Sequence, residues 1–245
     1  MPSITFAGVD LSAYRLVLVT PDPSTQMATE AYQMLTRSYA PESKRTPKNI
    51  ILGVEVVGTS RATAEAYLDS IKAVLNRSMD GRLVLSNMPD RYWMARYQSL
   101  VGLWPAPSTF SGTLSFICHD PMAYAVAETN VSYSIDADPK EISLTVAGSG
   151  DAEPQFILTA GEAWDSTLYI VNAALGQTFQ WTGVMTSGQR LTVDSRLWYV
   201  SLDGSASMTG VGGQFPLLVP GSNLIAVSGF GSLGSMRIRY KARYA

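Results

Sequence analysis

The chain has 245 residues, of which 46% are hydrophobic and only 16% are charged, and its formal net charge is −2. This length allows one large β domain or two modest ones, and the 20 glycines and 13 prolines indicate a turn-rich β protein rather than a helical one. The near-neutral charge excludes a basic field over the whole chain, which is the usual mark of a nucleic-acid-binding protein.

The single cysteine, Cys118, excludes an internal disulfide, so the chain can mature in a reducing compartment. It falls on the apolar side of a predicted strand, which favours a buried and inert thiol. The first residues lack the basic and continuous apolar regions of a signal peptide. Because no run approaches the roughly 18 apolar residues of a membrane span, we expect no membrane insertion.

The first predicted elements are two strands, Ile4–Phe6 and residues 14–20. The second is apolar on both faces, which is typical of a strand buried between layers or against another chain. Residues 21–48 follow, with four prolines and scattered basic side chains, and residues 28–35 have the spacing of a short helix. So long a segment is either a surface loop or an arm that orders against a neighbouring subunit, and the sequence leaves both interpretations open.

A strong strand at residues 50–57 precedes the clearest helix, predicted over residues 61–77. Ser60 is a natural N-cap because its hydroxyl can accept an otherwise unpaired N–H of the first turn. Apolar residues recur along the helix at helical spacing and predict one stripe that faces a sheet: Ala64, Tyr67, Leu68, Ile71, Val74 and Leu75.

Three further strands complete the first half, at residues 83–85, 92–101 and 113–118. We interpret residues 104–107, which read WPAP, as a rigid connector between the last two strands. Asp120-Pro121 then ends the final strand, because proline cannot donate to a ladder. The first domain is thus predicted as residues 1–126, a β-sandwich or β-roll with one packed α-helix.

From Glu128 onward, strands of about five to eight residues alternate with Gly, Asp and Asn turns, which predicts a β-sandwich over residues 127–245. The fold class is therefore mainly β in both domains. In the last predicted strand, residues 235–244, four basic side chains share one face: Arg237, Arg239, Lys241 and Arg243. We interpret this face as a solvated sheet edge protected by charge, with a surface for an acidic partner as the alternative.

Catalytic and metal-binding groups are hard to assemble from this sequence. His119 is the only histidine, and the adjacent Cys118 points to the opposite face of the same strand. One His and one Cys do not make a usual zinc site, and no phosphate loop, dinucleotide fingerprint or calcium loop is present. The carboxylates of the second domain fall mostly on turns, where Asp is common in any case. We predict no catalytic residues, no metal, no cofactor and no enzyme activity.

Aromatic residues of the second domain raise the question of sugar binding. Trp164, Trp198 and Tyr199 are the candidates for stacking on a sugar ring. Trp198 and Tyr199 point to opposite sides of one predicted strand, so at most one of them belongs to the core of the domain. Most aromatics in such domains are packing residues, so core packing or a subunit contact is the competing explanation.

Several stretches, taken in order, resemble the distal tail protein family of long-tailed bacteriophages. The likeness covers nearly the whole chain. In the first half it rests on FAGVD at residues 6–10, the strand and helix of residues 51–75, residues 82–97, and SFICHDPMAY at residues 115–124. In the second half it rests on EPQFI (153–157), YIVN (169–172), RLTVD (190–194) and FPLLVPGSN (215–223).

The resemblance implies a structural virion protein at the distal end of a phage tail, assembled in the host cytoplasm. Such proteins form a ring, usually of six subunits, that joins the tail tube protein to a trimeric tail hub. Double-stranded DNA passes through the lumen of the ring without specific binding. The first domain builds the ring, and the second, a galectin-like sandwich, projects outward and often carries receptor-binding or side-fibre proteins.

Rings close by heterologous contacts, so each subunit needs two different interface patches. We predict that the 21–48 segment and the strand at residues 92–101 contribute to one of them. The candidate interface residues are Arg37, Lys44, Arg45, Lys48, Trp93 and Tyr97. The alternative function is that of a carbohydrate-binding adhesion protein that acts through its C-terminal sandwich.

Overall fold

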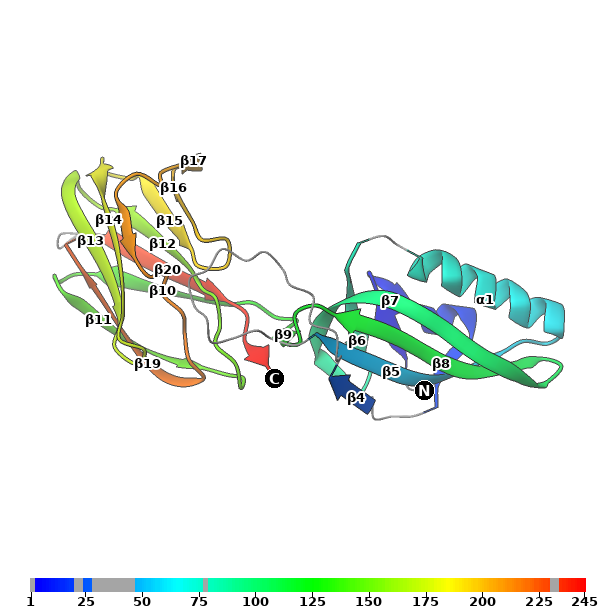
Figure 1. Ribbon diagram of the computed structural model, residues 1–245. Coiled ribbons are helices and arrows are strands. Elements are labelled where there is room, and N and C mark those ends of the chain that lie inside the picture. The colour runs from blue at the N-terminus through cyan, green and yellow to red at the C-terminus, as the bar shows by residue number, and fades with distance from the viewer. Residues whose placement is uncertain (1–2, 20–23, 28–46, 77–78, 230–233) are drawn as a thin grey trace. The chain divides into compact units, whose positions relative to one another are not determined.

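The computed structural model describes residues 3–19, 24–27, 47–76, 79–229 and 234–245, and only the backbone of residues 24–27. The chain divides into two compact units, Met1–Val126 and Ala127–Ala245 (Figure 1). Each unit buries hydrophobic side chains of its own. In the described residues, no helix is long and apolar enough to cross a membrane.

The first unit is built on one antiparallel sheet with the strand order β2-β1-β6-β7-β8-β5-β3, while β4 pairs with β5 and β9 pairs with β7. Its strands are β1 (Ile4–Phe6), β2 (Val9–Asp10), β3 (Leu16–Leu18), β4 (Ser24–Met27), β5 (Lys48–Val57), β6 (Gly81–Leu85), β7 (Met88–Ala106), β8 (Thr109–Cys118) and β9 (Ala123–Ala125). Strands β3 and β4 pair with successive parts of β5, on the side away from β8.

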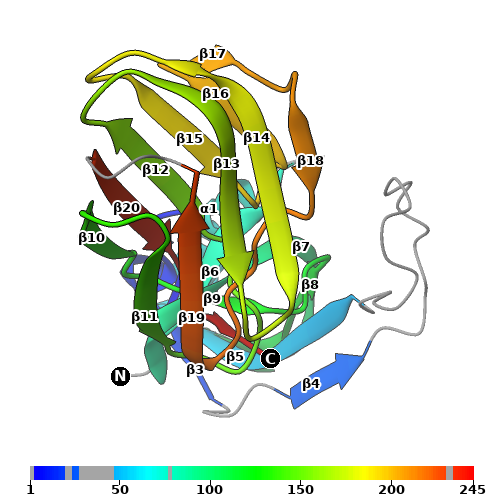
Figure 2. The same cartoon turned by 90° about the vertical axis from the view of Figure 1, so that its left-hand side faces the viewer.

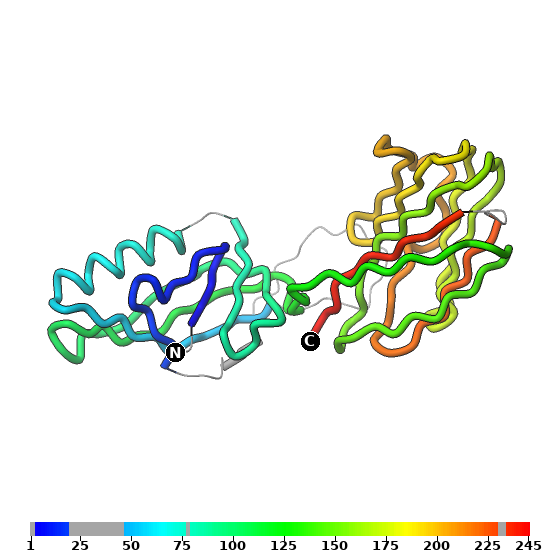
Figure 3. The backbone as a smooth tube through the Cα atoms, turned by 180° about the vertical axis from the view of Figure 1, so that it is seen from behind, coloured from blue at the N-terminus to red at the C-terminus, as the bar shows by residue number. Residues whose placement is uncertain are grey.

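The helix α1 (Arg61–Leu75) lies along one face of this sheet, as Figure 1 shows from the front and Figure 3 from behind. The Oγ of Ser60 accepts the N–H of Thr63 at 3.2 Å, so the predicted N-cap is present. Four residues of the predicted stripe are buried: Ala64, Leu68, Ile71 and Leu75. A short 3₁₀ helix, η1 (Leu11–Tyr14), contacts α1. Tyr14, which was predicted to begin a strand over residues 14–20, is the last residue of this helix.

The connector predicted at residues 104–107 is wrong, because β7 continues to Ala106 and turns directly into β8. The missing N–H of Pro105 is tolerated there, since the pairing between β7 and β8 shifts register between Leu103 and Ala106. The ring of Trp104 packs edge-on against Phe110, with ring centres 5.7 Å apart. The guanidinium of Arg61 lies 4.5 Å from the centre of the Trp104 ring. The WPAP stretch is therefore the end of a strand that packs against α1.

The second unit is a β-sandwich of two antiparallel sheets (Figure 2). One sheet has the order β10-β20-β12-β15-β16-β17 and the other β11-β19-β13-β14-β18. The bounds are β10 (Thr129–Ile135), β11 (Lys140–Val146), β12 (Gln155–Ala160), β13 (Trp164–Asn172), β14 (Gln177–Met185), β15 (Arg190–Asp194), β16 (Tyr199–Leu202), β17 (Ser205–Ala206), β18 (Val211–Gly213), β19 (Gly221–Ser228) and β20 (Gly234–Tyr240), followed by β21 (Arg243–Tyr244).

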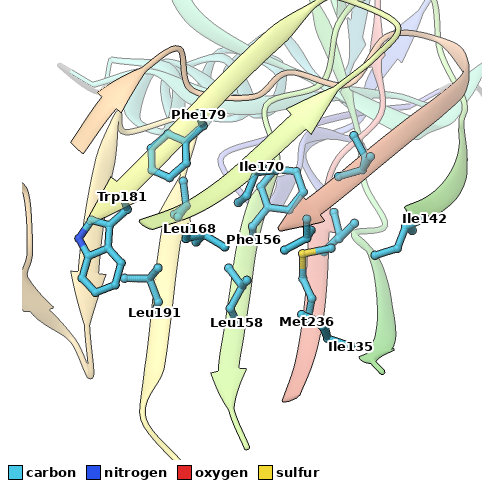
Figure 4. Packing of buried hydrophobic residues seen from close by; sticks show 14 of the residues in the cluster. Ile135, Ile142, Phe156, Leu158, Leu168, Ile170, Phe179, Trp181, Leu191 and Met236 are labelled. Atoms are coloured by element: carbon cyan, nitrogen blue, oxygen red, sulfur yellow. The ribbon is translucent and has the colours of Figure 1, made fainter. Parts of the chain in front are cut away.

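Alternate residues of the two sheets meet in one core, seen from close by in Figure 4. Phe156 and Leu158 of β12 face Phe179 and Trp181 of β14, and all four are almost fully buried. The Trp181 ring covers Gly183, where an added Cβ would lie 2.5 Å from the ring. This close approach explains why the strand carries a glycine at that point.

The interpretation of the last strand as a solvated edge is also wrong. Strand β20 lies between β10 and β12, one strand in from the edge of its sheet, so its ladder groups are paired on both sides. Its charged face is partly neutralised, since Arg239 forms a 2.6 Å ion pair with Glu128. Arg243 lies beyond β20, is only 3% exposed, and pairs with Glu153 at 2.6 Å. The four basic residues therefore do not form one solvated row.

Candidate interaction surfaces

The predicted subunit-interface residues separate into three groups. Arg37, Lys44 and Arg45 lie outside the described residues. Lys48 and Trp93 are brought together, with the Lys48 Nζ 5.8 Å from the centre of the Trp93 ring. Trp93 is only 5% exposed, and its indole Nε1 has no hydrogen-bond partner among the residues the structure describes.

Tyr97 lies further along β7 and packs edge-on against Phe116, with ring centres 6.4 Å apart. Partial burial raises the pKa of the Tyr97 phenol, against the effect of a hydrogen bond with the backbone of Leu100. Trp93 and Tyr97 thus contribute to packing within the first unit, and an interface role for either of them stays a prediction.

The structure reveals an apolar surface that the sequence reasoning did not pick out. The face of the first sheet that points away from its buried side carries exposed Val19, Val57, Val101 and Leu103, which we call the open face. Their exposed fractions are 51%, 45%, 68% and 64%. No described element of the first unit covers them.

Strand register explains why these side chains share one face. Val101 pairs with Thr113 of β8, and Thr113 pairs with Gly53 of β5. The carbonyl of Gly53 accepts the N–H of Val19 at 2.9 Å, so these positions form one row across the sheet. Val57 and Leu103 follow at even spacing from Gly53 and Val101, and they therefore project to the same side. The alternating apolar residues Val101 and Leu103 of β7 could have predicted this face. They were missed because the strand was predicted to end at Val101 and residues 104–107 were interpreted as a connector.

The predicted sugar-stacking residues occupy three different environments. Trp164 is only 8% exposed, stacks on Trp181 with ring centres 5.6 Å apart, and donates its indole N–H to the carbonyl of Gly229. Its ring therefore offers no free face to a sugar. Tyr199 is half-buried at the start of β16. Trp198 alone is well exposed, at 56%.

Trp198 is held outward by a tight turn between β15 and β16. The Asp194 carboxylate accepts the N–H groups of Arg196 and Leu197, each at 3.0 Å. Trp198 itself has a φ of 52°, in the left-handed region that bulky residues rarely adopt. Its ring stacks on Phe215 with centres 6.4 Å apart and an interplanar angle of 18°. One face of the indole is thus supported by the protein while the side chain stays exposed.

The groups considered for catalysis are dispersed. In the described ranges, no three His, Cys, Asp or Glu side chains cluster closely enough to hold a metal ion. Cys118 is fully buried, and burial raises the pKa of its thiol to about 12. The neutral thiol therefore predominates at neutral pH, and it is a weak nucleophile.

Comparisons with known proteins bear on the fold. No protein-family model matches the sequence, and no curated protein matches it either. Among solved structures, the crystal structure of the SPP1 Dit protein (gp 19.1) superposes with a TM-score of 0.73 at 13% identity, over 100% of both chains. The chain has the fold of SPP1 Dit.

The Dit fold includes both units of the chain, since the match extends over the full length of each protein. The expected fold class, mainly β with one helix, is therefore confirmed. The resemblance to distal tail proteins is confirmed at the level of the fold. Two structures of the phage p2 baseplate in its activated conformation, with Sr and with Ca, align at 11% identity over 98% or more of each chain. Their TM-scores of 0.44 and 0.43 are too low to add to the argument.

Proposed function

We propose that this chain is a structural protein of a bacteriophage tail tip that assembles into a ring. The full-length correspondence with SPP1 Dit carries this proposal, because that protein is described as a paradigm of the hub adsorption apparatus in phages infecting Gram-positive bacteria. Fold alone does not determine function, so the ring and its partners must be tested directly. The proposed role is mechanical and requires no catalytic residue.

In this proposal the subunits form a homo-oligomeric ring, with six copies as the expected number. The ring joins the tail tube protein to a trimeric hub at the distal end of the tail, and double-stranded DNA passes through its lumen. The second unit provides the attachment point for receptor-binding or side-fibre proteins.

The open face supports the assembly step of the proposal. Exposed apolar side chains that cluster on a sheet face not covered by another layer mark interaction sites on soluble proteins. A closed ring needs two unlike patches on each subunit, and the open face provides one of them. Lys48, Trp93 and Tyr97, together with Arg37, Lys44 and Arg45, remain candidates for the other.

Negative-stain electron microscopy of the purified chain tests the assembly. We expect ring-shaped class averages with a central hole wide enough for duplex DNA. Leu103→Glu should abolish the rings and leave monomers, because it buries an unpaired charge in the contact. Val184→Glu is the matched control, since Val184 is 59% exposed on the second unit.

If the Leu103→Glu variant still forms rings, the open face is not part of the subunit interface, although ring formation itself is supported. A wild-type chain that stays monomeric even when co-expressed with tail tube and hub proteins would contradict the proposed function as a whole.

Carbohydrate binding through the second unit is a second candidate function, favoured by the exposed and supported ring of Trp198. Stacking on an aromatic face is a common way to bind a sugar ring. A glycan array should then show binding that Trp198→Ala removes and Tyr169→Ala retains, since Tyr169 is also exposed, at 39%, but lies on the other sheet. Equal signals from both variants would reject Trp198 as a sugar platform.

A further inference from the structure

The outer face of the six-stranded sheet contains a shallow hollow of about 70 Å³. Its floor is formed by Ile157 and Thr159 of β12, and its walls by residues of the flanking strands. The lining residues are Ser132, Ile157, Thr159, Arg190, Ser235, Met236 and Arg237, of which Met236 points its side chain into the core. The hollow lies entirely within the second unit.

Strand register places two arginines on opposite sides of this floor. Thr159 pairs with Arg190 of β15, and Ile157 pairs with Arg237 of β20. Since neighbouring strands lie about 4.8 Å apart, the backbones of β15 and β20 are separated by roughly 10 Å. Arginine side chains reach across such a distance, so both guanidinium groups can approach one small ligand in the hollow.

The two arginines differ from their neighbour in the same sheet. Arg239 is neutralised by Glu128 at 2.6 Å, whereas neither Arg190 nor Arg237 forms an ion pair within the part of the chain that the structure describes. Both are exposed. The carboxylate of Asp203 accepts the backbone N–H of Arg190 at 2.9 Å, and it forms no ion pair with the Arg190 guanidinium in the described structure.

The remaining polar groups of the hollow are hydroxyls from three different strands: Ser132 on β10, Thr159 on β12 and Ser235 on β20. A hydroxyl can donate to an anion, and a guanidinium presents two parallel N–H groups to one. No carboxylate lines the hollow. Its chemistry is therefore that of an anion receptor rather than of a cation or apolar site.

We propose that this hollow binds a phosphate group. One water molecule needs about 10–15 Å³ of such space, so a hollow of about 70 Å³ has room for a group the size of one phosphate. A tetrahedral phosphate presents more acceptor oxygens than a planar carboxylate, and it matches two guanidinium groups and three hydroxyls arranged around it. The site is distinct from Trp198 and does not depend on ring assembly.

Titration of inorganic phosphate and of glycerol 3-phosphate into the full chain at low ionic strength, followed by ¹⁵N–¹H NMR, tests the proposal. We expect saturable shifts of the Arg190 and Arg237 side-chain resonances, and little response to acetate. Arg190→Gln and Arg237→Gln should each weaken binding about tenfold or more, because each removes a charge-assisted contact. Arg196→Gln is the control, an exposed arginine of the same unit outside the hollow.

Similar affinities for the two probes would show that the site recognises the phosphate group alone. Tighter binding of glycerol 3-phosphate would show that the site also contacts the glycerol part of the ligand. The absence of saturable binding would overturn the proposal. So would equal responses to phosphate and acetate, or equal binding by all three variants with thermal melts unchanged.

Discussion

At the scale of single residues, two buried asparagines join the loops at one end of the sandwich. The Asn172 Nδ2 donates to the carbonyl of Leu217 at 2.6 Å and to the Oδ1 of Asn223 at 3.2 Å. The side chain of Asn223 in turn accepts the N–H of Val219 at 2.9 Å and donates to the Val219 carbonyl at 2.8 Å. Both residues belong to stretches that carried the family resemblance, YIVN and FPLLVPGSN, which places those two stretches in contact.

Replacing Asn223 should therefore be strongly destabilising. Asn223 is only 1% exposed, so Asn223→Ala leaves several buried polar groups without partners. We expect the free energy of unfolding to fall by about 2–3 kcal/mol, measured by urea denaturation. The exposed Asn130 provides the control, and Asn130→Ala should change the unfolding free energy by less than about 0.5 kcal/mol. Equal effects of both substitutions would contradict the network.

The thiol of Cys118 should be inert in the folded protein. Burial raises its pKa from the ordinary 9.0 to about 12, while the charge of Lys48 acts in the opposite direction. At about pH 8, Ellman's reagent should react with it only after denaturation. Rapid reaction in the native state would show that β8 opens at this point.

The same shift has a consequence for stability at alkaline pH. Between pH 9.0 and about 12, the folded protein keeps a proton that the unfolded chain releases. The contribution of this thiol to the free energy of unfolding is thus complete below pH 9.0 and declines as the pH rises toward 12. Comparison with Cys118→Ala across that range isolates this contribution from those of Tyr and Lys.

At the scale of elements, α1 shows how local chemistry sets a boundary. The Ser60 cap satisfies an N–H of the first turn, so Ser60→Ala should lower the unfolding free energy by about 1 kcal/mol. Ser70→Ala is a suitable control, because Ser70 lies within α1 and its hydroxyl bonds back to the carbonyl of Ala66 at 2.9 Å. That change should be neutral or slightly stabilising, since alanine is the better helix former. Chemical denaturation monitored by circular dichroism measures both variants.

Periodicity was sufficient to predict α1, β5 and most strands of the sandwich, because each buries one regular face. It failed where the chain departs from regularity. β17 and β18 have only two and three residues, too few to show a period. Pro105 looked like a strand terminator but lies within β7, next to its last residue. The charge along β20 looked like an edge signal, but β20 is paired on both sides and Arg239 is ion-paired.

The candidate surfaces were harder to predict, since they depend on residues that become neighbours only through pairing. Arg190 and Arg237 are 47 positions apart in the printed sequence and meet only because β12 lies between their strands. The open face likewise combines three separate parts of the first unit. The Lys48–Trp93 contact shows the reverse case, in which two residues chosen separately from the sequence do come together.

At the scale of the whole molecule, the chain consists of two units with separate cores. Phe156→Ala should remove a fully buried ring from the second core and destabilise that unit by about 3–5 kcal/mol. Scanning calorimetry should then show one transition moving to lower temperature while another stays in place. Leu52→Ala, at a fully buried position of the first unit, should move the other transition. A single transition that shifts in both variants would mean that the units unfold together.

The position of β20 between β10 and β12 has a consequence for the order in which the sheet can form during synthesis. Among the described strands, β10 pairs with β20 alone, and nearly all of the second unit is translated between the two. While the ribosome completes that stretch, β10 and one side of β12 have exposed ladder groups that can pair with another nascent chain. Closure of the sheet is therefore a late, non-local and comparatively slow event. Nascent chains on neighbouring ribosomes run the greatest risk of aggregation in this interval, before the proposed ring can begin to form.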